Sequence, residues 1–390
     1  MNIINKVDYP FELGKNAQLA FDTLMMRPTK GIAQYYVHLM DRHEIEHFAG
    51  MPYGSYDKDI ENVYLTSHKK TGTCFIDQYI PENSLIVNDC ELADMMKNAP
   101  STGAENFVRD GIVINSPEAV AEHLERVKFP ENIAWAKSLD EPAVAKKTAD
   151  EFIQAEFALQ KKFGKDILKV PYDAFRIPGY RYTEYGYVNY FSAYALYEDV
   201  IERDFKLIAD AAEKHNRILA KAIIDANLIP IIRLDCDMAG TRGTMTDIKS
   251  LDRIWFPHLE RAIKPAIDAG FRLIWHSDGN LMEMYPRLLE VGISGFEGFQ
   301  YEHGMDYPKI CKMKDRDGNP VQIWAGVSVS KTLPFGTPED VRRELKWLVD
   351  EGPKTGLILS VSSSVTPGTP RRNLEALFDG LEYYREHGRD

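Results

Sequence analysis

Residues 229–237 read IPIIRLDCD, an apolar run that ends abruptly in acidic residues. Such a run, rich in isoleucine and too short for a buried helix, is typical of a strand in a parallel sheet. FRLIWHSDG (271–279) repeats the pattern, again with polar residues at its end. ISGFEGF (293–299), QIWAGVSV (322–329) and GLILSVS (356–362) follow it. We therefore expect a series of parallel strands in the second half of the chain.

The first half holds weaker strand patterns, at IAQYYVH (32–38), TCFIDQYI (73–80) and ILKVPYDAF (167–175). Eight strand candidates interleaved with helical segments predict an α/β fold, an eight-stranded (β/α)8 TIM barrel with extra helices and loops in the N-terminal half. A doubly wound open sheet is the competing architecture. Neither a G-x-G-x-x-G nor a Walker loop supports it.

No Gly/Ser-rich or Pro-rich linker divides the chain, so we expect one domain over 1–390, with an N-terminal extension (1–30) and a helical insertion (80–165). Helix-capping patterns begin at Ser116, Thr337 and Thr369, each followed by proline. Ser250 is predicted to cap a segment that ends near Asp268, which Pro257 bends or divides into two helices.

The net charge of −12 disfavours nonspecific binding to nucleic acid or to an anionic membrane. No apolar run approaches the roughly 20 residues that a membrane-spanning helix needs. The N-terminus lacks a secretory pattern, and the four cysteines are too scattered for a disulfide framework. These features favour a cytoplasmic location.

In a barrel of this kind the active site lies at the C-terminal ends of the strands. Polar side chains gather at these ends in the sequence: Asp235, Cys236 and Asp237; His276, Ser277 and Asp278; Glu297, Gln300 and Glu302; and Ser362 to Ser364. Each acid on its own could simply cap a following helix. Together with His276, which follows a fully apolar strand, the set favours a divalent-metal site or acid–base chemistry.

Two further segments leave alternatives open. His43-Glu44-Ile45-Glu46-His47 formally matches the H-E-x-x-H pattern of zinc proteases, but a charged, solvated first helix explains it as well. Residues 180–191, YRYTEYGYVNYF, are rich in tyrosine. They could form a packed loop or an aromatic wall for a ligand, with Tyr180, Tyr182 and Tyr187 as its members.

The chain resembles the uroporphyrinogen decarboxylase superfamily, especially its corrinoid-dependent methyltransferase branch. The resemblance lies in CDMAG (236–240), IWHSDGNLMEMYPRLLEVGISGF (274–296), EHGMD (302–306) and LPFGTPEDVRREL (333–345). It implies a (β/α)8 barrel, which agrees with the strand count. The decarboxylase's R-x-x-G-R motif is missing near residues 27–42. Thiol-methylating members bind zinc through His-x-Cys and a later Cys, where this chain has His276, Asp278 and serines near Ser363.

What the resemblance then implies is a methyltransferase of the O-demethylase type. Such an enzyme moves a methyl group from a methoxylated, aryl methyl ether substrate to cobalamin carried by a separate corrinoid protein. Zinc is the implied metal, with Asp237, His276, Asp278 and Glu297 as candidate ligands and an open position for the ether oxygen. Asp237, His276 and Asp278 are the candidate catalytic residues. Glu297, Gln300 and the three tyrosines are the candidate substrate-binding residues.

Other assignments remain open at this stage. One alternative is a decarboxylase or other lyase acting on a carboxylated substrate, and another is a thiol-methylating enzyme. A third is a non-catalytic binding protein that kept the barrel. Without metal, a carboxylic acid of raised pKa could protonate the leaving oxygen. The chain could also form a homodimer.

Overall fold

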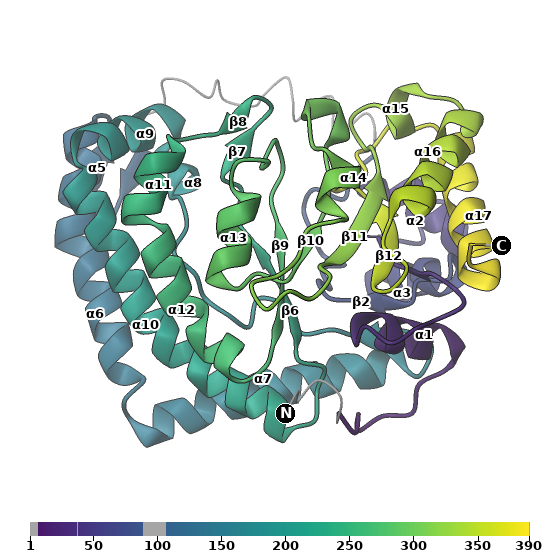
Figure 1. The fold of residues 1–390 in the computed structure, drawn as a ribbon, viewed down its shortest axis with the longest axis horizontal. Coiled ribbons are helices and arrows are strands. Elements are labelled where there is room, and N and C mark those ends of the chain that lie inside the picture. Colours follow the sequence, from purple (N-terminus) through teal and green to yellow (C-terminus); the bar gives the residue numbers. More distant parts are fainter. Residues whose placement is uncertain (1–6, 37, 89–106, 390) are drawn as a thin grey trace.

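Eight short strands alternate with helices in the computed structural model, which describes residues 7–36, 38–88 and 107–389 (Figure 1). The strands are β1 (Ala33–Gln34), β2 (Phe75–Ile76), β5 (Leu168–Lys169), β6 (Ile231–Asp235), β9 (Arg272–His276), β10 (Gly295–Glu297), β11 (Gln322–Val327) and β12 (Leu357–Val361). All eight fall inside the runs that the sequence predicted.

The strands close into a ring. Six of them form one parallel sheet in the order β1-β12-β11-β10-β9-β6. β2 pairs with β5, also in parallel. The Cys74 N–H donates to the Gln34 carbonyl across 2.9 Å, and a parallel bridge joins Tyr172 to Arg233. These contacts link β1 to β2 and β5 to β6, so the (β/α)8 barrel is confirmed.

Helices surround this ring. They are α1 (Lys15–Leu24), α2 (Arg42–Ala49), α3 (Ile60–Lys70), α5 (Pro117–His123), α6 (Phe129–Ser138), α7 (Pro142–Phe163), α8 (Tyr182–Tyr185), α9 (Tyr187–Leu196), α10 (Glu198–Asp225), α11 (Ile248–Ile254), α12 (Phe256–Asp268), α13 (Tyr285–Val291), α14 (Tyr307–Ile310), α15 (Thr332–Phe335), α16 (Pro338–Glu351) and α17 (Arg371–His387), with a π-turn at Leu124–Lys128 and a 3₁₀ turn at Tyr301–His303. Two small hairpins join β3 (Phe107–Arg109) to β4 (Ile112–Ile114) and β7 (Ala239–Gly240) to β8 (Gly243–Thr244).

The segment predicted as a helical insertion, 80–165, contains α5, α6 and α7 together with the β3–β4 hairpin. Residues 89–106 of that segment lie outside the described residues. The barrel interior is filled by large side chains such as Tyr35, Phe75 and Trp324. Helix α1 packs against the same cluster through Phe21 and Leu24. Gln322, the first residue of β11, donates to the Thr23 and Leu24 carbonyls, so α1 covers the base of the barrel.

Local signals predicted some helix starts and missed others. Ser116 caps α5, and Thr337 forms a capping box with Asp340 at α16, as the sequence indicated. Ser250 is not a cap, because it lies inside α11, where its hydroxyl contacts Tyr194 and Glu198. A second helix does begin beside Pro257. Thr369 does not cap α17, since its hydroxyl donates to the Thr366 carbonyl instead.

A buried histidine on α3 makes the fold sensitive to acid. His68 stacks on Tyr36 with ring centroids 4.3 Å apart, and its Nδ1 lies 3.1 Å from the Thr73 hydroxyl. Burial, and then the charge of His38, lowers the pKa of His68 to about 3 from a usual 6.5. Between pH 3 and pH 6.5 the unfolded chain therefore binds a proton at His68, whereas the folded chain does not. Stability contributed by the neutral ring is present above pH 6.5 and is lost as the pH falls towards 3.

We expect replacement of His68 by phenylalanine, which keeps the stacking, to flatten this acid response. The loss of unfolding free energy between pH 7.5 and pH 4.5 should be about 2.5 kcal/mol smaller in the variant. Denaturant unfolding at several pH values measures it. Parallel pH curves for the two proteins would show that His68 does not titrate in this way.

Candidate metal centre

Three ionisable side chains stand in a row where β6, β9 and β10 end. In the strand register Asp235 is the partner of His276, and His276 is the partner of Glu297. Adjacent strands lie about 4.8 Å apart, so side chains in register on one face come within reach of each other. Asp237 follows two residues after Asp235, just beyond β6. The C-terminal mouth of the barrel therefore holds an imidazole among carboxylates.

Glu297 holds the inner nitrogen of His276. Its carboxylate makes an ion pair with Nδ1, and both side chains are buried. Burial opposes a charge on His276, but the charges of Glu297 and then Asp235 outweigh it and raise the pKa of the ring to about 10. The outer nitrogen, Nε2, lies 3.9 Å from Asp235 Oδ1. In this arrangement Glu297 orients the ring and Nε2 is the atom presented to the mouth.

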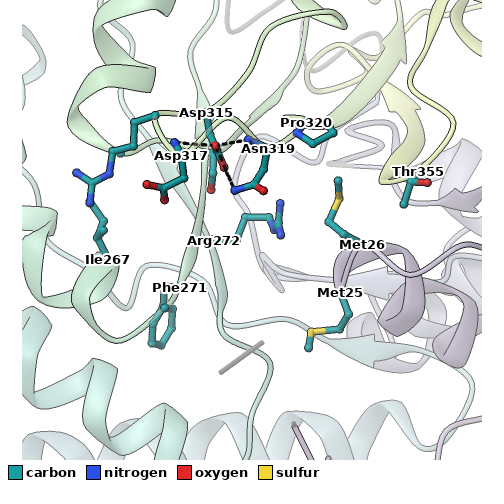
Figure 2. Close-up of a pocket in the computed structure, with 14 residues that line it drawn as sticks. Met25, Met26, Ile267, Phe271, Arg272, Asp315, Asp317, Asn319, Pro320 and Thr355 are labelled. Atoms are coloured by element: carbon teal, nitrogen blue, oxygen red, sulfur yellow. Dashed lines mark hydrogen bonds between the residues drawn. The ribbon is translucent and has the colours of Figure 1, made fainter. Parts of the chain in front are cut away.

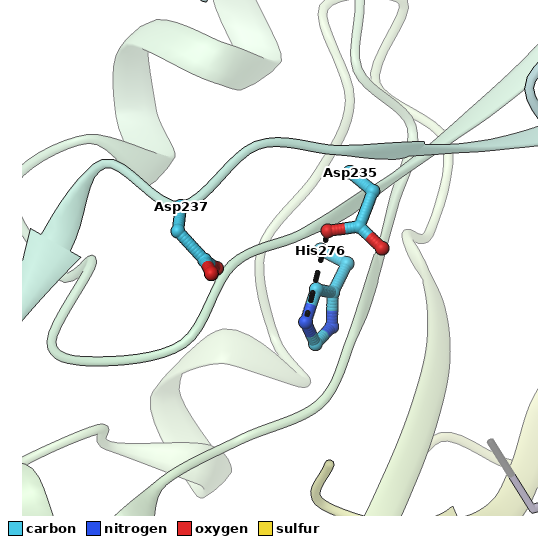
Figure 3. Close-up of side chains that lie close together, drawn as sticks. All are labelled: Asp235, Asp237 and His276. Carbon is cyan, nitrogen blue, oxygen red and sulfur yellow. Dashed lines mark ion pairs between the residues drawn. The ribbon is translucent and has the colours of Figure 1, made fainter. Parts of the chain in front are cut away.

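Asp235, Asp237 and His276 offer ligand atoms that lie within 4.8 Å of one another (Figure 3). Within the ranges that the structure describes, no other group of His, Cys, Asp or Glu has this spacing. Donor atoms on one tetrahedral zinc lie roughly 3.4 Å apart, so a small inward movement would complete the geometry. Carboxylate oxygen and imidazole nitrogen are both ordinary zinc donors.

Each of the two aspartates is anchored through one of its carboxylate oxygens. Asp235 Oδ2 accepts from Arg233 at 2.9 Å and from the Tyr172 hydroxyl at 3.2 Å. Its Oδ1 is the oxygen nearer to His276. Asp237 Oδ1 accepts the backbone N–H of Asp278 at 2.9 Å. Side chains anchored in this way need little reordering to bind a cation.

Arg233 is a buried cation beneath this cluster. Its Nε donates to Asp77 across 2.7 Å, and Nη2 donates to Gln78 across 3.2 Å. Glu297 lies 3.9 Å from Nη1, and the guanidinium also stacks on the Tyr172 ring. Although burial raises the pKa of Asp77, the charge and hydrogen bond of Arg233 outweigh it and hold that pKa below its usual range. The guanidinium thus orients the carboxylates on three strands.

Asp278 and Gln300 occupy the next position around the mouth. Gln300 donates to Asp278 Oδ1 at 3.1 Å and accepts the Gly279 N–H at 2.8 Å. The Ser363 hydroxyl lies 3.5 Å from the other oxygen of Asp278. Burial raises the pKa of Asp278, while the nearby charge of His276 lowers it by a smaller amount. Asp278 thus lies beside the group of three close side chains, held by Gln300 and near Ser363.

The tyrosine-rich segment forms α8 and the start of α9. Tyr182 and Tyr187 are stacked with centroids 4.5 Å apart. Burial, then the charge of Asp237, raises the pKa of Tyr182, so this ring lies near the mouth. The Tyr180 hydroxyl is hydrogen-bonded to Thr246. A Cβ on Gly179 would sit 3.2 Å from Cys236 Sγ, which also places this segment beside the end of β6.

The cysteine at the end of β6 does not join the cluster. Cys236 Sγ lies beside Gly179, and burial raises the pKa of the thiol to about 12. Its Sγ is not among the ligand atoms of the close group Asp235, Asp237 and His276. Of the four ligands that the sequence suggested, His276 and Asp237 lie in the close group, while Asp278 and Glu297 lie beside and behind it. Asp235 is the third residue of the close group.

The H-E-x-x-H segment lies elsewhere, on α2. Glu44 makes a bidentate ion pair with Arg371, and His43 stacks on Tyr53. His47 is exposed and lies 3.6 Å from Glu375. A metalloprotease needs the glutamate free to activate water beside both imidazoles. This segment is therefore a partly solvated helix whose Ile45 is buried, as the structural interpretation of the motif expected.

Gly298 allows the chain to pass close to the imidazole. Its φ of +68° is in the left-handed region, and a Cβ there would lie 2.7 Å from the Ser362 carbonyl and 3.0 Å from His276 Nδ1. We expect Gly298→Ala to destabilise the protein by roughly 1–3 kcal/mol more than Gly54→Ala. Gly54 has φ +81° but nothing within 4 Å of its Cβ, so it controls for backbone strain alone. Equal unfolding free energies for the two variants would contradict the close approach.

Sequence patterns missed the supporting residues of this site. Arg233 interrupts the apolar run IPIIRLDCD, and a charged residue inside a buried strand is a signal that could have been used. Asp77 stands similarly inside TCFIDQYI. Tyr172 carries no such signal, since nothing local shows that it reaches a carboxylate on β6.

In the described part of the chain, no helix is long and apolar enough to cross a membrane. Residues 218–384 match the family model named Uroporphyrinogen decarboxylase (URO-D). No curated protein matches the chain in sequence. The fold is similar to that of a methyltransferase from Methanosarcina mazei, with a TM-score of 0.55 and 18% identity over 96% of this chain and 99% of the other. A B12-independent methionine synthase from Shewanella sp. W3-18-1 aligns over 48% of this chain and 56% of its own length, at 20% identity and a TM-score of only 0.28.

Proposed function

We propose that this chain, whose residues 218–384 match the uroporphyrinogen decarboxylase family model, is the methyltransferase of an O-demethylation reaction. It takes a methyl group from a methoxylated substrate, an aryl methyl ether, and passes it to the cobalt of a corrinoid held by a partner protein. The single observation that carries this proposal is the group Asp235, Asp237 and His276 at the barrel mouth. The barrel fold shared with the Methanosarcina mazei methyltransferase supports the reaction class.

The difficult part of this reaction is to stabilise the negative charge that develops on the leaving oxygen. The methyl carbon passes to reduced cobalt, the carbon–oxygen bond breaks, and its electron pair stays on oxygen. Phenol has a pKa near 10, so the phenolate leaves poorly unless its charge is stabilised. A site rich in oxygen and nitrogen donors without a thiolate suits an ether oxygen better than it suits activation of a thiol.

A divalent cation, zinc in our proposal, fits the residues present. Asp235 and Asp237 would each give one oxygen, and His276 would give Nε2. Asp235 shares the Arg233 guanidinium with Asp77, and Asp237 has no cationic partner among the described residues. The mouth therefore carries an excess of negative charge that a divalent cation would neutralise. When bound, the metal would supply Lewis-acid stabilisation of the ether oxygen.

The chain's own residues prepare this site. Glu297 fixes the orientation of the His276 ring, which leaves Nε2 directed to the mouth. Arg233 holds Asp235, and the backbone N–H of Asp278 holds Asp237. The Asp278 carboxyl, with its raised pKa, is the group we assign to hand a proton to the leaving oxygen. Gln300 positions that carboxyl.

The aromatic substrate would lie against the tyrosine-rich segment. Tyr182 and Tyr187 present a stacked pair near Asp237, and Tyr180 packs edge-on against Phe191. Rings of this kind offer a large apolar surface with hydroxyl groups at the edge, which matches a methoxylated arene. Glu297 then acts through His276 rather than by touching the substrate.

Transfer from a methoxyarene to free cob(I)alamin tests the proposal. We expect loss of the cob(I)alamin absorbance with formation of one phenol per methylcobalamin, and about one zinc per chain in the purified protein. Removal of the metal by a chelator should abolish turnover, and added zinc should restore it. Release of carbon dioxide from a carboxylated substrate without cobalt would instead support a decarboxylase. Tight ligand binding without metal or turnover would support a binding protein.

A further inference from the structure

A second pocket opens at the opposite end of the barrel from the metal centre. Its volume is about 500 Å³, within the range of small-molecule sites. It lies at the start of β9 and beside the end of α1, with Arg272, Phe271 and Met25 in its lining (Figure 2). His276 lies four positions after Arg272, or about 13 Å along β9. A ligand here would not touch the methyl-transfer site.

Arg272 is the unusual side chain in this pocket. It is the first residue of β9, and the two-residue alternation puts it on the same strand face as Ile274, which packs in the barrel interior. Its Nε is buried without a hydrogen-bond partner. Within the described ranges no ion pair or hydrogen bond involves its guanidinium. Burial lowers its pKa, and the nearby charge of Asp315 only partly opposes this.

Asp315 is near Arg272, but its carboxylate is used within its own loop. Oδ1 accepts the backbone N–H groups of Asp317 and Asn319, at 3.0 and 2.8 Å. Figure 2 shows these bonds on the side of the loop beside Arg272. Arg272 as a whole is half-buried, and a cation whose solvation is reduced in this way is stabilised by an anion that pairs with it.

We propose that this pocket binds a small monocarboxylate with an apolar body, whose carboxylate pairs with the Arg272 guanidinium. The residues that line the pocket suit both the carboxylate and the apolar body of such a ligand. Asp315 and Asp317 also line the pocket, so a phosphate dianion would meet more repulsion there than a monoanion. Met25, Met26, Ile267 and Phe271 supply an apolar wall for the rest of the molecule.

Calorimetric titration of the full-length protein with hexanoate at pH 7 tests the site, with hexanol and inorganic phosphate as comparison ligands. We expect hexanoate to bind and hexanol to bind at least about tenfold more weakly, because it lacks the charge-assisted hydrogen bonds. Arg272→Met should weaken hexanoate by at least about tenfold. Arg217→Met, at an exposed arginine on α10, is the matched control and should leave binding unchanged.

The same variants give a second measurement that needs no ligand. If Arg272 is a half-buried cation without an ion-pair partner, Arg272→Met should leave the melting temperature of the free protein unchanged or raise it. Hexanoate should raise the melting temperature of the wild type but not of Arg272→Met. The proposal is overturned if hexanoate does not bind, if phosphate binds more tightly than hexanoate, or if Arg272→Met lowers the melting temperature of the free protein. Methyl-transfer activity is not a readout here, so failure would not bear on the proposed function.

Discussion

His276→Ala is expected to lower the rate of methyl transfer roughly 10³-fold, the usual cost of removing a group that stabilises charge on a leaving oxygen. In the proposed site this ring supplies the nitrogen donor, and the other two candidate donors are carboxylates. Its loss should also reduce the zinc content of the purified protein. Initial rates with cob(I)alamin and a methoxyarene, together with metal analysis, measure both effects.

The alanine variant also leaves Glu297 buried without its ion-pair partner, so folding must be measured separately. His276→Gln keeps a polar side chain beside Glu297 and should retain the fold while losing activity. Glu297→Gln keeps all three candidate ligands, Asp235, Asp237 and His276, but removes the charge that orients the ring. It should weaken zinc binding about 10–100-fold, the usual effect of removing such a supporting carboxylate.

His47→Ala is the matched control, because His47 belongs to the rival H-E-x-x-H motif and is exposed. It should leave both zinc content and methyl transfer unchanged. If His47→Ala loses the metal while His276→Ala retains it, the metal centre is not at the barrel mouth. If both retain full activity, the leaving-group role of His276 is wrong.

The barrel could be predicted because each strand carries its own signal. IPIIRLDCD and FRLIWHSDG are apolar runs that end in polar residues, and their ends fixed where the site would lie. Their register could not be predicted, since it depends on how neighbouring strands slide past one another. That register sets Asp235 opposite His276 and Glu297 on its other side. Sequence spacing therefore suggested Asp237, His276, Asp278 and Glu297 as ligands, whereas the structure brings Asp235, Asp237 and His276 closest together.

The roles of side chains whose partners are distant in the sequence could not be predicted either. Glu297 looked like another ligand at a strand end, yet it pairs with Nδ1 behind the ring. Ser250 and Thr369 looked like helix caps, but each hydroxyl found a different partner. Where a side chain has several possible partners, tertiary packing determines which one it contacts. Thr337 and Asp340, by contrast, form a capping box within four consecutive residues, which the local sequence predicts.

Arg233→Met is expected to destabilise the protein by about 3–5 kcal/mol, because it removes one partner of a buried charge network. Arg233 is 1% exposed and pairs directly with Asp77 and Asp235. Methionine fills much of the same volume, so the cost arises from the carboxylates left without a partner. Denaturant unfolding measures it. Arg217→Met, at an exposed site, should change the unfolding free energy by less than about 0.5 kcal/mol.

The double variant Arg233→Met with Asp77→Asn separates charge from packing. Neutralising Asp77 removes much of the uncompensated charge, so we expect it to recover a large part of the lost stability. It should not recover methyl transfer, because Asp235 still lacks the guanidinium that holds its Oδ2. A double variant as unstable as Arg233→Met would mean that Arg233 acts by filling space. Recovery of both stability and full activity would mean that Asp235 needs no such anchor to serve the metal centre.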